Sequence, residues 1–173
     1  MNLRVMFQDE ARFGRMSLPY ACWAPKPFRP KVELALVREF VYEYAAVCPQ
    51  DGALTEAMAD KMNTLNMSDF LAKMSAQFPE DYVLLVVDGA SSHKSKDLKV
   101  PDNVRLCTLP PYSPELNPTE HLWDELREKY FANKVFDSLG AVCAQLQEGM
   151  EHYRLHPEAI VSLTAWPWIL ASL

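Results

Sequence analysis

Three acidic side chains in this chain lie where hydrophobic segments end or begin. Asp9 follows the alternating run 3–8, and Asp88 follows the most apolar run, residues 82–87. Glu120 lies near the start of an amphipathic segment. Open α/β sheets bind their ligands beyond the carboxyl ends of the strands. If the first two segments are parallel neighbours, about 4.8 Å apart, Asp9 and Asp88 can reach one cation between them.

The chemistry that suits such a group is the binding of a divalent metal ion. Two ionised carboxylates that close together would raise the pKa of one of them, and a cation removes that penalty. Oxygen ligands without cysteine or obligatory histidine favour Mg²⁺ or Mn²⁺ over Zn²⁺. Each acid alone also has a simpler interpretation: an exposed strand end for Asp9, a turn at Asp88-Gly89, and a favourable helix-dipole position for Glu120.

The hydrophobic pattern predicts the elements that must position these acids. It predicts strands at 3–8, 40–47, 53–58, 82–87 and 104–109, with a turn at 49–52 and a proline-rich loop at 14–30. It predicts a helix capped by Ser68, a helix from Pro118 with an apolar stripe, and helices at 138–153 and 157–163. The order predicts an α/β domain with a mixed sheet flanked by helices.

The composition is that of one globular domain. The 173 residues suffice for a single core, and 49% hydrophobic with 23% charged residues exclude a disordered chain or a coiled coil. No apolar stretch spans a bilayer and the N-terminus lacks a signal-peptide core, so we expect a cytoplasmic protein without a membrane partner. The four cysteines are widely spaced, which predicts reduced thiols and no cysteine-based zinc site.

The charges are segregated along the chain. The net charge of −6 argues mildly against a dedicated nucleic-acid-binding module. Residues 11–32 nevertheless hold five cations and no acid, whereas residues 115–128 hold five acids and only Arg127 as a lysine or arginine. A polyanion and a metal ion could therefore meet on one domain, or the two stretches could be ordinary solvated faces.

Three motifs resemble those of a known family. Residues 109–123, Leu-Pro-Pro-Tyr-Ser-Pro-Glu-Leu-Asn-Pro-Thr-Glu-His-Leu-Trp, are similar to a signature of mariner-like transposases and their bacterial insertion-sequence relatives. Residues 86–93, Val-Val-Asp-Gly-Ala-Ser-Ser-His, resemble the second-acid motif of that family. Residues 7–13, Phe-Gln-Asp-Glu-Ala-Arg-Phe, resemble the first. The motifs occur in the family's order and extend over most of the chain.

The resemblance implies a ribonuclease H-like fold and a DDE endonuclease triad. The triad carries over to Asp9, Asp88 and Glu120, and Glu120 follows Asp88 by 32 positions. Two divalent ions, Mg²⁺ (or Mn²⁺), would activate water and then a DNA 3′-hydroxyl for attack on a phosphodiester. We expect Glu10 on the opposite strand face and Asp124 one helical turn from Glu120. A role for His93 beside the second acid is a hypothesis.

The resemblance also implies DNA partners, namely transposon ends and a target, in DNA transposition and recombination. Transposases of this type carry helix-turn-helix regions ahead of the catalytic domain, and this chain starts at the first catalytic strand. We therefore expect residues 1–173 to be a single catalytic domain, with the DNA-binding region on a missing N-terminal part. The candidates for phosphate contacts are Arg12, Arg15, Lys26, Arg29, Lys31, Lys94 and Lys96.

Four questions stay open at this point. The chain could be a truncated or domesticated transposase that binds DNA or a partner without catalysis. A glycosidase would use a carboxylate pair without metal, with Trp23, Trp166 and Trp168 stacking on sugars. His152 and His156 could begin a zinc site, although no third ligand is evident. The segment 166–168, Trp-Pro-Trp, could cover the core or contact a second copy in a homodimer.

Overall fold

The computed structural model describes residues 2–89, 95–111 and 113–171. One mixed sheet has the strand order β3-β2-β1-β4-β5. β1 and β2 are antiparallel, as are β2 and β3, whereas β4 runs parallel to both β1 and β5. The strands are β1 (Asn2–Met16), β2 (Leu36–Val47), β3 (Leu54–Ala59), β4 (Asp81–Val87) and β5 (Val104–Thr108).

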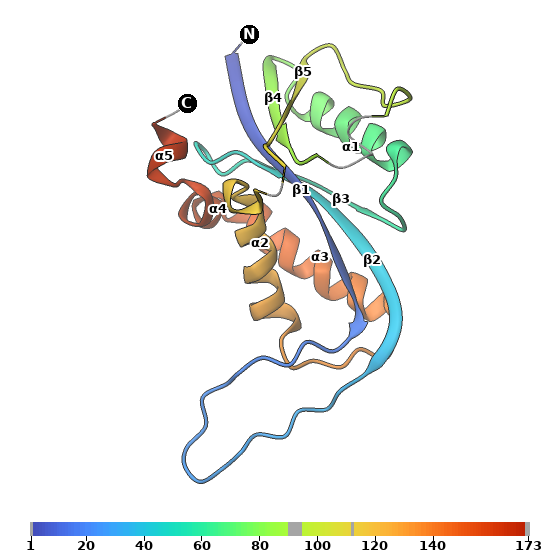
Figure 1. The fold of residues 1–173 in the computed structure, drawn as a ribbon, viewed down its shortest axis with the longest axis vertical. Helices are drawn as coiled ribbons and strands as arrows, with labels where there is room; N and C mark the ends of the chain where they lie inside the picture. The colour runs from blue at the N-terminus through green and yellow to red at the C-terminus, as the bar shows by residue number, and fades with distance from the viewer. Residues whose placement is uncertain (1, 90–94, 112, 172–173) are drawn as a thin grey trace.

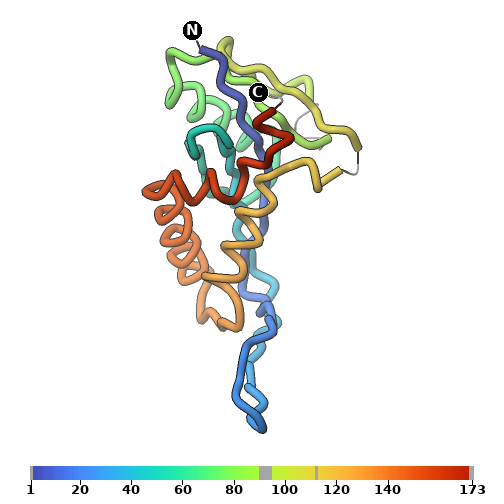
Figure 2. The backbone as a smooth tube through the Cα atoms, turned by 90° about the vertical axis from the view of Figure 1, so that its left-hand side faces the viewer, coloured from blue at the N-terminus to red at the C-terminus, as the bar shows by residue number. Residues whose placement is uncertain are grey.

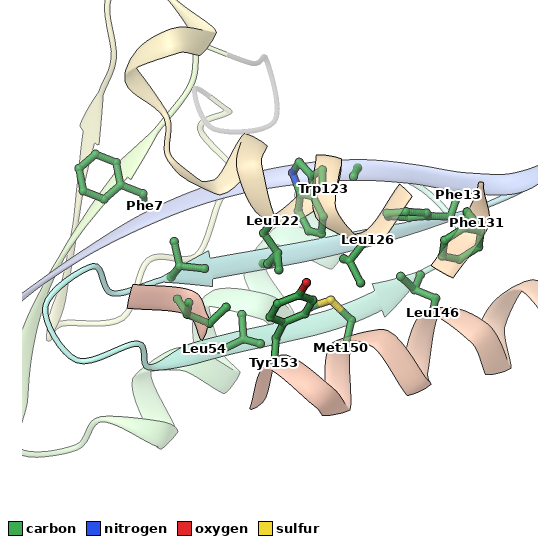
Figure 3. Packing of buried hydrophobic residues seen from close by; sticks show 14 of the residues in the cluster. Phe7, Phe13, Leu54, Leu122, Trp123, Leu126, Phe131, Leu146, Met150 and Tyr153 are labelled. Atoms are coloured by element: carbon green, nitrogen blue, oxygen red, sulfur yellow. The ribbon is translucent and has the colours of Figure 1, made fainter. Parts of the chain in front are cut away.

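Helices cover both faces of this sheet, as Figure 1 shows. α1 (Thr64–Gln77) lies on one face, over a core cluster that includes Met6, Tyr44 and Leu85. α2 and α3 lie on the other face, where their side chains pack against β1, β2 and β3 (Figure 3). The helices of this second layer are α2 (Thr119–Leu126), α3 (Leu139–Leu155), α4 (Pro157–Thr164) and α5 (Pro167–Leu170). The mixed sheet flanked by helices is the predicted ribonuclease H-like fold.

The first strand is longer than predicted. β1 continues to Met16, so Asp9 lies inside the strand and the predicted loop from Gly14 begins later. The alternation of buried side chains continues through Ala11 and Phe13, and β2 pairs with this part of β1. β4, however, pairs with β1 only as far as Phe7. Beyond Phe7, β1 therefore pairs with β2 alone among the described strands.

Two further differences concern helix ends. Ser68 does not cap α1, because Asn63 accepts a hydrogen bond from the Asn66 backbone N–H at 2.8 Å and starts the helix earlier. The Ser68 hydroxyl instead donates to the Thr64 carbonyl and accepts from the Lys99 N–H. α2 continues into a π-helical turn, Arg127–Phe131, and the prediction missed the short α5.

Residues 17–35, here called the arm, connect β1 to β2. The arm extends beyond the end of the sheet as a long excursion with little regular structure (Figures 1 and 2). Its root is held by a bridge between Leu18 and Ala132 and by two hydrogen bonds between Tyr20 and Asn133. Trp23 near its middle is fully exposed.

None of the helices in the described ranges has an apolar stretch that could span a bilayer. The end of the chain packs onto the domain through Trp166. Its ring meets that of His121 in α2 edge-on, with centroids 4.9 Å apart. Trp168 is half-exposed. The first tryptophan of this segment therefore covers α2 within the same chain.

Candidate active site

The two predicted aspartates lie at matching positions of neighbouring parallel strands. The last ladder pair between β1 and β4 joins Phe7 to Val86. Asp9 and Asp88 each lie two residues further along, and both are half-buried. The two segments are parallel neighbours, which is the condition under which the sequence places both carboxylates around one cation. Both carboxylates consequently sit at the edge of the sheet where the two strands separate.

The third acid is brought to this edge by two buried polar side chains. The Thr119 hydroxyl donates to the Phe7 carbonyl at 2.8 Å, and the Asn117 amide donates to the Gln8 carbonyl at 2.9 Å. The Asn117 side-chain oxygen also accepts from the Thr119 N–H at 3.2 Å. These bonds hold the start of α2 against the two residues that precede Asp9. Glu120, the second residue of α2, is thereby placed beside Asp9.

Trp123 makes a direct hydrogen bond to the first aspartate. Its indole N–H donates to Oδ2 of Asp9 at 2.9 Å, and the ring is fully buried. Phe13 meets this ring edge-on, with centroids 6.1 Å apart (Figure 3). The sequence predicted Trp123 only as part of an apolar stripe. Its position one turn after Glu120 was the available signal for a polar role.

The raised pKa values of Asp9 and Glu120 show that the acids of this site interact electrostatically. Burial, the largest cause, and the charge of Glu120 together raise the pKa of Asp9 to about 7, and the Trp123 N–H opposes this shift. Burial also raises the pKa of Glu120, which Arg127 lowers and the charge of Asp88 raises.

Two neighbouring acids lie outside this group. Strand alternation places Glu10 on the opposite face from Asp9, since its ladder partner Tyr44 belongs to the core under α1. Asp124 is exposed and lies 3.7 Å from the Arg127 guanidinium. Both positions agree with the expectations from the sequence. His93 lies outside the described residues.

The donor set is made of carboxylate oxygens, which suits a hard divalent cation such as Mg²⁺ or Mn²⁺. In the described ranges, no three His, Cys, Asp or Glu side chains are arranged to hold a metal ion as they stand. Because the pKa of Asp9 is raised to about 7, binding of a cation would require Asp9 to lose its proton near neutral pH.

The cations proposed for DNA contacts are dispersed. Arg12 lies three residues after Asp9 on β1, whereas Arg15 is occupied by Glu39 at 2.8 Å and by the Phe136 carbonyl at 2.9 Å. Three others, Lys26, Arg29 and Lys31, lie on the arm, and Lys96 is exposed between β4 and β5; Lys94 lies outside the described residues. The structure therefore brings only Arg12 near the acids along one element.

Comparison with known families gives the class of protein. The family model described as DDE superfamily endonuclease matches residues 4–143. This chain belongs to the DDE superfamily endonuclease family. A protein of Sinorhizobium fredii described as uncharacterized protein y4pE/y4sA is 36% identical over 98 residues, which are 56% of this chain and 73% of that protein.

Solved structures of Mos1 transposase share the fold. A pre-cleavage Mos1 transpososome matches with a TM-score of 0.64 and 15% identity, covering 94% of this chain and 56% of the Mos1 chain. The Mos1 mariner paired-end complex with Mn matches with a TM-score of 0.60 and 17% identity, over 94% and 56% of the respective chains. This chain thus spans a little over half the length of the Mos1 chains.

Proposed function

We propose that this chain is a transposase catalytic domain that performs metal-dependent DNA strand cleavage and strand transfer. Asp9, Asp88 and Glu120 would hold two divalent ions, Mg²⁺ (or Mn²⁺). The observation that carries the proposal is the convergence of three half-buried acids from β1, β4 and α2 at one sheet edge. Family membership and the shared fold with Mos1 transposase in its transposon-end complexes support it.

The side chains of the site have distinct tasks in this proposal. Bound ions would supply the activation of water or a DNA 3′-hydroxyl and the stabilisation of the leaving oxygen. Asp9 and Glu120 would hold the ions as carboxylates that face the reaction centre. Trp123 keeps Oδ2 of Asp9 oriented by its N–H and leaves the other carboxylate oxygen available. Asn117 and Thr119 fix the separation of β1 from α2.

The partners follow from the same proposal. We place the transposon-end and target DNA along the edge of the sheet that carries the three acids, in the manner expected of a bacterial insertion-sequence transposase. Residues 1–173 are then one catalytic domain, and the helix-turn-helix region belongs to a preceding part of the protein. A cytoplasmic location and a homodimer that joins two DNA ends complete this picture.

Mn²⁺ titration by calorimetry tests the metal site without needing the DNA-binding part. We expect the wild-type chain to bind Mn²⁺ and Asp88→Ala to lose that binding. Asp97→Ala is the matched control, because Asp97 is an exposed acid between β4 and β5. Equal binding by the wild type and Asp88→Ala would contradict the triad. Binding without strand cleavage on a DNA substrate would instead favour a truncated or domesticated protein that no longer catalyses the reaction.

A further inference from the structure

A hollow of about 370 Å³ opens where the arm leaves the sheet. Its walls come from the end of β1, the start of β2 and the π-helical turn after α2. Three cations line it, Arg12, Arg127 and Lys134, together with aromatic rings that include Phe40 and Phe136. No acidic residue is among its described lining residues, although the chain has a net charge of −6.

Two of the three cations of this hollow, Arg12 and Lys134, have no carboxylate partner within the described ranges. Arg12 is exposed and lies over the Phe40 ring at 4.4 Å. Arg127 lies 5.7 Å from the Phe13 ring centre and 3.7 Å from the exposed Asp124, an ion pair that water weakens, and its charge also acts on Glu120. Lys134 donates to the neutral side chain of Gln145. The hollow therefore attracts an anion.

The hollow lies at a short distance from two of the three acids, Asp9 and Glu120. Arg12 follows Asp9 by three residues on one strand, which is about 10 Å along β1. Strand alternation places Arg12 on the face of Glu10, whereas Phe13, which also lines the hollow, lies on the face of Asp9. Arg127 follows Glu120 by seven residues on one helical segment, again about 10 Å along its axis. Stacked DNA advances about 3.4 Å per nucleotide. A strand whose phosphate lies at the acids would present a nucleotide to this hollow about three positions away.

We propose that this hollow binds one nucleotide of single-stranded or unpaired DNA. Its phosphate contacts the guanidinium groups of Arg12 and Arg127, and its base stacks on the planar groups of the wall. Guanidinium planes and aromatic rings are the surfaces on which unpaired bases stack. A phosphate without a base would leave that wall unused. The inference rests on the proposed function, because the strand is the one that reaches the three acids.

Binding of a short thymidine oligonucleotide, measured by fluorescence anisotropy in EDTA, tests the hollow. We expect Arg12→Ala to bind several-fold more weakly and to lower the slope of log K against log salt by about 0.7, the effect of one lost phosphate contact on single strands. Arg105→Ala on β5 is the matched control, since Arg105 is also exposed and lies outside the hollow. Arg12→Ala indistinguishable from Arg105→Ala would overturn the proposal.

An abasic deoxyribose-phosphate chain of the same length tests the base. We expect the wild type to prefer the thymidine oligonucleotide roughly tenfold, and Phe40→Leu to lose that preference while it keeps the salt slope. If the wild type binds the thymidine oligonucleotide and the abasic chain equally well, the hollow does not bind a base, and only a phosphate contact is left. Since EDTA removes metal, these results stand if the Mn²⁺ titration fails. If the wild type binds Mn²⁺ and Arg12→Ala binds the oligonucleotide as the wild type does, the proposal for the hollow is rejected and the proposed function is not.

Discussion

Asp9 on β1 and Glu43 on β2 carry partly or fully buried carboxyl groups on the same face of the sheet. Burial raises both pKa values, to about 7 for Asp9 and to about 8 for Glu43. Asp9 is half-buried and accepts a hydrogen bond from Trp123, whereas Glu43 is 1% exposed and one of its oxygens has no partner among the described residues. Similar pKa shifts thus arise in two different environments.

The surroundings of Glu43 are already balanced in charge. Lys73 reaches Glu56 at 3.7 Å, and Arg154 reaches Glu151 at 3.0 Å, around a hollow of about 530 Å³. The acids beside Asp9 come from a strand end and a helix start, and the cation nearest to them in the helix, Arg127, is 29% exposed. The raised pKa values of Asp9 and Glu43 therefore both report burial. Convergence of acids that solvent can reach is what distinguishes the candidate site.

Mn²⁺ affinity is expected to distinguish Asp9 from Glu43 more strongly than any other measurement. We expect Asp9→Asn to weaken Mn²⁺ binding by more than the roughly 10–100-fold that loss of an outer hydrogen-bond partner costs, because a ligand is removed. Glu43→Gln should leave the affinity unchanged. Isothermal calorimetry on both variants measures this difference. Equal loss in the two variants would mean that the cation site is not at Asp9.

Replacing the indole of Trp123 tests the hydrogen bond that Asp9 has and Glu43 lacks. Trp123→Phe keeps an aromatic ring in the core but removes the N–H that orients Oδ2 of Asp9. We expect roughly 10–100-fold weaker Mn²⁺ binding. Trp166→Phe, which removes an N–H bonded to a backbone carbonyl, is the matched control for stability. Unchanged affinity in Trp123→Phe, with a folded protein by circular dichroism, would show that the hydrogen bond does not position the carboxylate.

The link between α2 and β1 is expected to affect stability. Thr119→Val preserves the shape of a fully buried side chain but leaves the Phe7 carbonyl without its 2.8 Å donor. An unsatisfied buried acceptor costs about 1–3 kcal/mol of unfolding free energy. Urea denaturation at neutral pH measures it. Ser113→Ala is the control, because Ser113 has only a long hydrogen bond to Pro111. Equal stability of both variants would contradict this link.

The pH dependence of stability separates the two carboxyl groups once more. Glu43 keeps its proton up to about pH 8 in the folded state, whereas its ordinary pKa is 4.5. Its contribution to stability is complete below about pH 4.5 and is lost as the pH rises to about 8. We expect wild-type stability to fall by up to about 1 kcal/mol per pH unit across that window.

Urea denaturation of Glu43→Gln between pH 5 and 8 checks this slope, which the substitution should flatten. Mn²⁺ should leave the part due to Glu43 unchanged, because Glu43 is 1% exposed and a bound ion cannot reach its carboxyl group. Mn²⁺ should reduce the part of the slope that is due to Asp9. A wild-type slope that Glu43→Gln leaves intact would assign the titration elsewhere.

The sequence predicted the strand that ends before Asp88 because residues 82–87 form an uninterrupted apolar run. It did not predict that β1 passes beyond Asp9, since Gln8, Asp9 and Glu10 interrupt the apolar pattern. Gln8 is nevertheless fully buried, with its side-chain nitrogen and oxygen unpartnered among the described residues. The polarity of a segment therefore misplaced the end of a strand that tertiary pairing with β2 extends.

The hydrogen bonds that position α2 were beyond prediction from local pattern. The bond of Asn117 to β1 spans 109 residues and that of Thr119 spans 112. The hollow at the root of the arm likewise joins cations that are far apart in sequence, Arg12 and Lys134. The start of helix α1 was also beyond prediction from residue type. Asn63 and Ser68 are both acceptable N-caps by type, and in the structure Asn63 is the cap.

The arm has a consequence for how this fold tolerates change. It hangs from two strands whose ladder is continuous from Phe7–Val47 to Gly14–Phe40, so the pairing sets the position of Asp9 independently of what connects the strands. Loop length adds little closure entropy per residue. The segment 21–33, beyond the two hydrogen bonds of Tyr20 to Asn133, is thus a natural insertion point. Shortened, lengthened or exchanged arms can be grafted there while the spacing between the acids and Arg12 stays constant.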